Sequence, residues 1–82
     1  MNFKFRVRMN LRPGIRDNQG QAVCHAINVM GFDTVSKVRI GRIIDIDLEA
    51  ESYEEAKASV KEMCKKQLVN LIMETYEIEF IA

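Results

Sequence analysis

The chain has 82 residues, 48% of them hydrophobic, and its 12 Lys and Arg are balanced by 12 Asp and Glu. The resulting zero net charge argues against a nucleic-acid partner, because affinity for phosphates depends on a surplus of basic side chains. Its few glycines and single proline exclude a disordered chain. We expect one domain over residues 1–82, with no signal-peptide core and no membrane span, and therefore a cytoplasmic protein.

A domain of this size buries about 60–65% of the surface that its unfolded chain exposes, so it usually needs a disulfide, a metal or a partner chain. Cys24 and Cys64 form no CxxC pair, which predicts reduced thiols. The chain has one histidine, His25, and no ligand cluster, which argues against a structural metal. We therefore expect another protein chain to supply the additional stabilisation that this small domain needs.

A first strand is predicted from the strict alternation of apolar and polar residues. Its apolar face consists of Phe3, Phe5, Val7, Met9 and Leu11, and its polar face of Lys4, Arg6, Arg8 and Asn10. Pro13-Gly14 then fits the centre of a type II turn. A helix follows, with Asp17 or Asn18 as its N-cap and Gly31 as its left-handed stop. Its apolar stripe is Ala22, Val23, Ala26, Ile27 and Met30.

The centre of the chain is predicted to be a tight hairpin between strands at 35–40 and 42–49. Gly41-Arg42 suits a type II′ turn, because its first central position needs a positive φ. A second helix opens at Ser52, with a capping box completed by Glu55, and ends near Asn70. Its apolar stripe is Tyr53, Ala56, Val60, Met63, Cys64 and Leu68. A final strand is predicted where Tyr76, Ile78 and Phe80 alternate with Glu77 and Glu79.

The outward faces of the predicted strands carry opposite charges. The first strand is basic there, whereas the strands at 42–49 and 76–80 are acidic. Opposite charges across neighbouring strands contribute about 0.2–1 kcal/mol per pair, so the basic strand should lie between the acidic ones. This is the 4-1-3-2 order of an α+β, ferredoxin-like βαββαβ domain, with a four-stranded antiparallel sheet and two helices on one face. Strands of a second chain would satisfy the same charges.

No group of residues forms a recognisable catalytic constellation. Cys24 and His25 point about 100° apart on a helix and lack a third group, which argues against a nucleophile–base pair. The acidic row on the strand at 42–49 would not enclose a metal ion. The helix start at 17–21 can hold an anion but also fits a plain N-cap. The outward face lacks the aromatic residues of an RNA-binding RRM, and a regulatory ACT-like module that binds a small ligand remains an alternative.

Three segments of the chain resemble one family. They are Leu11–Ala22, Val38–Arg42, and Val60–Asn70 followed by Glu74-Thr75-Tyr76. In order and spacing they are similar to the D-P-Q-G helix start, the V-R-x-G-K hairpin and the M-C-x-x-L-L-A-N helix end, followed by E-D-Y, of the PurS subunit of phosphoribosylformylglycinamidine (FGAM) synthase. The resemblance covers essentially the whole chain. The departures from the family's usual residues are Asn18, Arg42, Gln67, Val69 and Thr75.

The resemblance implies a non-catalytic subunit of an ATP-dependent, glutamine-hydrolysing ligase of purine biosynthesis. That assembly converts formylglycinamide ribonucleotide, glutamine and ATP to formylglycinamidine ribonucleotide, glutamate, ADP and phosphate. In the family, ATP, Mg²⁺ and glutamine are used by a large synthetase subunit and a glutaminase subunit, so we expect this chain to bind no cofactor itself. In the family, the small subunit forms a dimer or a dimer of dimers and helps to hold the other two together. We expect this domain to self-associate through sheet edges or exchanged strands.

We expect two places on the chain to contact these partners, and no catalytic or metal-binding residue. The contacts are the helix start at Asp17, Gln19 and Gly20 and the hairpin tip at Arg39, Gly41 and Arg42. Ordinary cap and turn chemistry explains the same residues equally well.

Overall fold

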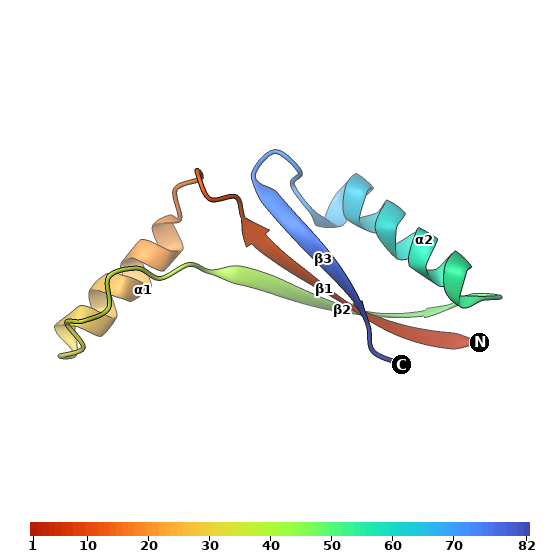
Figure 1. Cartoon of the computed structure of the whole chain (residues 1–82), viewed down its shortest axis with the longest axis horizontal. Coiled ribbons are helices and arrows are strands. Elements are labelled where there is room, and N and C mark those ends of the chain that lie inside the picture. The colour runs from red at the N-terminus through yellow and green to blue at the C-terminus, as the bar shows by residue number, and fades with distance from the viewer.

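The computed structural model describes all 82 residues as an elongated molecule of 52 × 25 × 14 Å. One end is a sheet with a helix packed on it, and the other is an arm made of a helix and an extended segment (Figure 1). The elements are β1 (Asn2–Leu11), α1 (Asn18–Val29), β2 (Gly41–Glu49), α2 (Tyr53–Met63), the π-helical turn η1 (Cys64–Leu68) and β3 (Glu74–Phe80). Neither α-helix has the length and hydrophobicity needed to cross a membrane.

The sheet has β1 at its centre, in the order β2-β1-β3, and both pairings are antiparallel. Its outward face carries ion pairs between the basic central strand and its acidic neighbours. Arg6 Nε lies 2.8 Å from Asp45 Oδ1, and Arg8 Nη1 lies 2.8 Å from Glu79 Oε2. The hydrogen bond from Arg6 lowers the pKa of Asp45. The prediction that the basic strand lies between two acidic strands is confirmed.

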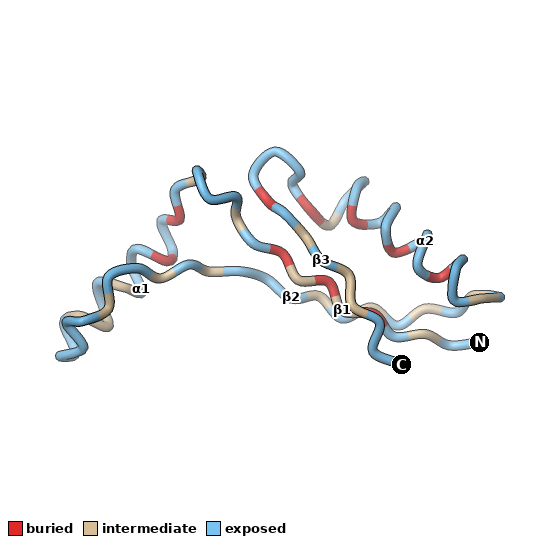
Figure 2. The backbone as a smooth tube through the Cα atoms, in the orientation of Figure 1, coloured by how far each residue is buried: buried red, intermediate tan, exposed pale blue.

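The core is small and lies between the inner face of the sheet and α2. Its buried apolar side chains are Phe5, Val7, Met9, Ala56, Val60, Cys64 and Val69. Next to it, the rings of Phe3, Phe5, Tyr53 and Phe80 form an aromatic cluster, in which Tyr53 and Phe80 lie 5.0 Å apart. Only ten of the 82 residues are buried, so a large part of the apolar surface is exposed (Figure 2).

Helix α2 begins where predicted, but it changes to the π-helical turn η1 at Cys64 instead of continuing to Asn70, and Met63, predicted on its apolar stripe, is exposed. The hydroxyl of Ser52 accepts a hydrogen bond from the backbone N–H of Glu55 at 3.2 Å. Ala56, Val60 and Cys64 recur every four residues and are fully buried against the sheet. Cys64 is fully buried, which confirms its prediction as a core residue, and this burial raises the pKa of its thiol.

The predicted hairpin around Gly41 is wrong. Residues 35–40 are extended but pair with no strand, and they run directly into β2, so the sheet has three strands instead of four (Figure 1). Gly31, with a φ of 106°, is the only residue with a positive φ, so neither Gly14 nor Gly41 adopts its predicted turn conformation. Gly41 is required for a different reason: a Cβ atom there would lie 2.8 Å from the backbone oxygen of Met9.

Helix α1 begins and ends where predicted but does not pack on the sheet (Figure 1). Its apolar residues are therefore exposed, and Met30 and Phe32 at its far end are 72% and 60% exposed. Gly20 is the only buried residue of the helix. The prediction of two helices on one face of the sheet fails because the segment after α1 does not return to the edge of β2.

A partly buried ion pair joins β2 to the start of β3. Arg42 Nη2 lies 2.8 Å from Glu74 Oε1 and also donates to the carbonyl oxygen of Leu68 at 3.2 Å. Glu74 Oε1 accepts a further hydrogen bond from the backbone N–H of Asn70 at 3.0 Å. The Asn70 N–H and the Arg42 guanidinium lower the pKa of Glu74, whose side chain is 12% exposed. This network holds the turn that follows η1 against the sheet.

Replacing Glu74 with Gln should lower the free energy of unfolding by about 1–2 kcal/mol, because charge-assisted hydrogen bonds to a mostly buried carboxylate are lost. Chemical denaturation at neutral pH measures this change. The matched control is Glu77→Gln, at an exposed position of the same strand, which should change stability by less than about 0.5 kcal/mol. Equal effects of the two substitutions would contradict a stabilising role for the Arg42–Glu74 pair.

The contribution of Glu74 should also depend on pH. Because its pKa is lower in the folded chain than in the unfolded chain, the stabilisation is present above the unfolded pKa, about 4.3. It is lost as the pH falls through the lower folded-state pKa. Between about pH 5 and pH 2 the natural chain should therefore lose more unfolding free energy than Glu74→Gln. Parallel stability curves for the two proteins would refute this assignment.

Candidate functional site

Three of the predicted site residues meet at the base of the arm, where α1 begins and the extended segment joins β2. Asp17 is buried, and its Oδ1 accepts from the backbone N–H of Gly20 at 2.7 Å. Its Oδ2 accepts from the backbone N–H of Ile40, also at 2.7 Å. These two donors, with Ile40 the stronger, lower the pKa of Asp17. One carboxylate thus caps the helix and also holds the extended segment beside it.

Gly20 and Arg39 complete this contact. A Cβ atom on Gly20 would collide with the backbone oxygen of Val38, so only glycine lets the helix approach the segment this closely. The guanidinium of Arg39 donates to the carbonyl oxygens of Ile15 at 2.8 Å and Arg12 at 3.1 Å, which fixes the loop before α1. We call Asp17, Gly20 and Arg39 the arm clamp.

The far end of the arm is held by Asn28, a residue that the sequence analysis missed. Its side-chain amide donates to the carbonyl oxygens of Val35 at 3.1 Å and Cys24 at 2.8 Å. The arm is therefore one unit, because α1 and the extended segment are joined at both ends. A polar residue near a helix end gives no sequence signal that would predict this contact.

The other three predicted site residues lie elsewhere. Gln19 is exposed on the first turn of α1, Gly41 lies against β1, and Arg42 pairs with Glu74 across the inner face of the sheet. The six residues therefore form no single site. Glu74 was missed, although the sequence contains a signal for it. Glu74 lies two residues before Tyr76, so its carboxylate falls on the apolar face of the strand.

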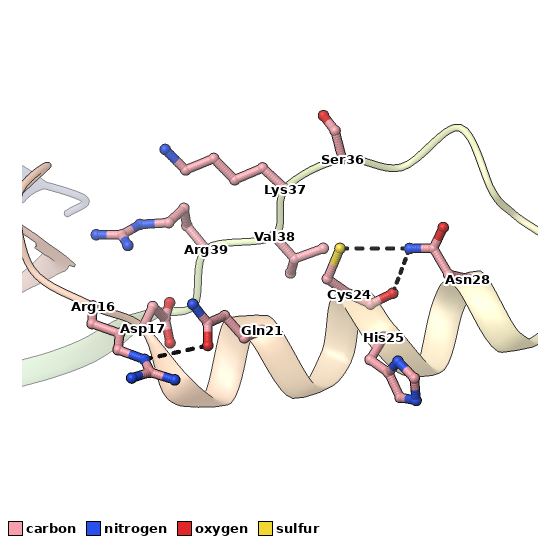
Figure 3. A pocket seen from close by; sticks show the side chains of 10 residues that line it. All are labelled: Arg16, Asp17, Gln21, Cys24, His25, Asn28, Ser36, Lys37, Val38 and Arg39. Atoms are coloured by element: carbon pink, nitrogen blue, oxygen red, sulfur yellow. Dashed lines mark hydrogen bonds between the residues drawn. The ribbon is translucent and has the colours of Figure 1, made fainter.

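A polar cavity of about 430 Å³ lies between α1 and the extended segment (Figure 3). Basic side chains line it, among them Arg16, Lys37 and Arg39, and both oxygens of its single carboxylate, Asp17, are hydrogen-bonded. Figure 3 shows the Sγ of Cys24 directed toward the extended segment and the imidazole of His25 directed away from it, which argues against a nucleophile–base pair.

No group of three His, Cys, Asp or Glu side chains is placed to hold a metal ion. The chain exposes three kinds of surface: the arm, the open edge of the sheet and the exposed apolar residues.

The sequence matches the family model "PurS: Phosphoribosylformylglycinamidine (FGAM) synthase" over residues 4–82. The FGAM synthase subunit PurS of Methanocaldococcus jannaschii is 38% identical over 77 residues, covering 94% of this chain and 93% of that protein. The PurS subunit of Bacillus subtilis is also 38% identical over 77 residues, covering 94% and 90%. These relatives do not support the alternative of an ACT-like regulatory module.

Solved structures of the same family share the whole shape. M. jannaschii PurS aligns with a TM-score of 0.82 at 35% identity, covering 96% of this chain and 95% of that one. The PurLQS structure from Thermotoga maritima contains a chain that aligns with a TM-score of 0.89 at 32% identity, covering 99% of both. Coverage this high includes the arm as well as the sheet. The chain belongs to the PurS family, the small non-catalytic subunits of FGAM synthase in purine biosynthesis.

Proposed function

We propose that this chain joins the synthetase and the glutaminase of FGAM synthase, so that ammonia passes between them without escaping. The main support for this proposal is the family match over residues 4–82. A second support is a relative whose solved structure is named as a complex of PurL, PurQ and PurS. ATP, Mg²⁺ and glutamine are then used by the partner subunits, and the assembly works in the cytoplasm.

The exposed surface of the chain supports a role in assembly. The arm carries unpacked apolar side chains at Val23, Val29, Met30 and Phe32, and the tip between η1 and β3 exposes Leu71 and Ile72. Contiguous exposed apolar surface on a small protein marks contact with other proteins. We propose that the chain forms a dimer or a dimer of dimers as well as binding the two enzyme subunits.

We propose the base of the arm as the surface that contacts these subunits. Within it, Asp17, Gly20 and Arg39 hold the shape, since their polar groups bond within the chain. Gly41 and Arg42 support the adjoining end of β2. Gln19 is the exposed member of the set and the one whose side chain is free to contact a partner.

Omitting this chain from a reconstitution of the three subunits should abolish FGAM synthesis from glutamine, because the glutaminase then releases ammonia into solution. Synthesis fed with an ammonium salt should continue, because the synthetase still binds ATP and its substrate. Rates with both nitrogen sources, with and without the chain, measure the effect. An unchanged glutamine-dependent rate without the chain would overturn the proposal.

The substitution Gln19→Trp should leave the thermal unfolding of the isolated chain unchanged but weaken its co-elution with the synthetase and glutaminase. The bulky ring obstructs the proposed contact surface without disturbing a buried group. The control Lys57→Trp places the same ring on an exposed position of α2, away from the arm. If both variants co-elute equally well with the partners, the base of the arm is not their contact surface.

A further inference from the structure

We infer that the polar cavity between α1 and the extended segment binds the phosphate group of a small, hydroxyl-rich molecule such as a sugar phosphate. The cavity has a volume of about 430 Å³ and lies within the arm (Figure 3). The cations that receive the phosphate are Arg16, Lys37 and Arg39. The bridging role of the proposed function requires no such ligand, and the site is independent of it.

The first observation is a group of three basic side chains without acidic partners. Arg16 comes from the loop before α1, and Lys37 and Arg39 come from the extended segment. None of the five ion pairs of the chain includes any of them. By contrast, the arginines of the sheet are all paired with carboxylates. The basic groups around the cavity therefore keep their charge available for an anion.

The second observation is an excess of positive charge around the cavity, although the whole chain is neutral. The lining holds three positive charges and one negative charge, on Asp17, which leaves an excess of two with His25 neutral. Both oxygens of Asp17 accept backbone N–H groups, so this carboxylate is engaged by its own chain. Helix α1 contains no acidic residue that could compete for the cations. A phosphate monoester carries a charge of about −1.5 to −2 at pH 7 and so matches this excess.

The number and kind of the cations favour phosphate over a carboxylate. A phosphate monoester presents three terminal oxygens, whereas a carboxylate presents two. Arginine guanidinium groups bind phosphate oxygens through two parallel N–H groups, and a lysine supplies a point charge. Lys37 and Arg39 project in the same direction from the extended segment (Figure 3), because alternate residues of an extended chain share one side. Together with Arg16 they supply one cation for each phosphate oxygen.

The third observation is that Arg39 is held in place before a ligand binds. Its Nη1 donates to the carbonyl oxygen of Ile15 at 2.8 Å, and its Nη2 donates to that of Arg12 at 3.1 Å. A guanidinium has five N–H donors, so three of them remain for a ligand. Carbonyl oxygens carry no net charge, so the positive charge of Arg39 is not cancelled. The same two bonds fix the loop that carries Arg16, which lowers the ordering cost of binding.

The rest of the lining suits a polar group attached to the phosphate. Of the ten lining residues, only Cys24 and Val38 are apolar. Small-molecule sites have volumes of about 300–1,000 Å³, so this cavity has room for more than a phosphate ion. Gln21, Asn28 and Ser36 add amide and hydroxyl groups to the wall. The amide nitrogen of Asn28 is used within the arm, which leaves its oxygen as an acceptor. The hydroxyl groups of a sugar match this lining, whereas an apolar group does not.

The test is a titration of the full chain with ribose 5-phosphate, followed by ¹H–¹⁵N NMR at constant ionic strength, because salt screens exposed charges. We expect saturable shifts of the backbone amides at residues 16–21 and 36–39, and none with ribose, which lacks the phosphate. Weaker binding of inorganic phosphate than of ribose 5-phosphate would support a sugar phosphate as the ligand. Equal binding of the two would overturn the role of the sugar and assign the site to the phosphate ion alone.

Single substitutions identify the residues of the site. Arg16→Gln and Lys37→Gln should each weaken the binding of ribose 5-phosphate by about three- to tenfold, because each removes a charge-assisted contact. Both should leave thermal unfolding unchanged, since Arg16 donates only a 3.4 Å hydrogen bond to Gln21 and Lys37 forms no ion pair. The matched control is Lys57→Gln, at an exposed position of α2, which should not change the affinity.

Two further results would contradict the site. Binding of succinate, a dicarboxylate of similar charge, as tight as that of ribose 5-phosphate would overturn the assignment to phosphate. The absence of saturable shifts with either phosphate, or equal weakening by Lys57→Gln and Arg16→Gln, would overturn the cavity as a binding site.

Discussion

The two hydrogen bonds accepted by Asp17 determine the shape of the whole chain. One oxygen caps α1 and the other accepts the N–H of Ile40, so the helix and the segment that follows it are held together as an arm. With the segment held there and continuing into β2, α1 lies away from the sheet (Figure 1). The sheet and α2 must therefore form a core of seven buried apolar residues by themselves. The open edge of the sheet and the unpacked apolar residues of α1 both follow from this arrangement.

A chain built in this way suits a subunit that acts by contact. Its titratable groups are used to hold structure: Asp17 in the arm clamp, Glu74 with Arg42, and Asp45 with Arg6. The conserved shape among PurS structures, with TM-scores above 0.8 over nearly the full length, includes the projecting arm. In the proposed assembly, other chains complete the burial that one chain leaves unfinished.

The sequence predicted the elements better than their arrangement. The alternation in β1, the Ser52 cap and the charges that place β1 between two acidic strands are local or pairwise features, and the structure confirms all of them. The prediction of a hairpin at Gly41 is wrong because glycine suits both a tight turn and a close approach of two strands. Only the contact with Met9 in the folded chain distinguishes these two roles. Among the site residues, the link from Asp17 to Ile40 spans 23 positions, and no local pattern encodes it. The resemblance supplied the family, which periodicity and composition could not.

The central claim is that this chain is incomplete alone and is finished by other chains, beginning with a second copy of itself. Sedimentation equilibrium of the unmodified chain at micromolar concentration tests this most directly. The account predicts a mass of at least twice the 9.5 kDa of a single chain, falling toward the single-chain value only on dilution. A species that remains at 9.5 kDa at high concentration, with cooperative thermal unfolding unaffected by concentration, would contradict it.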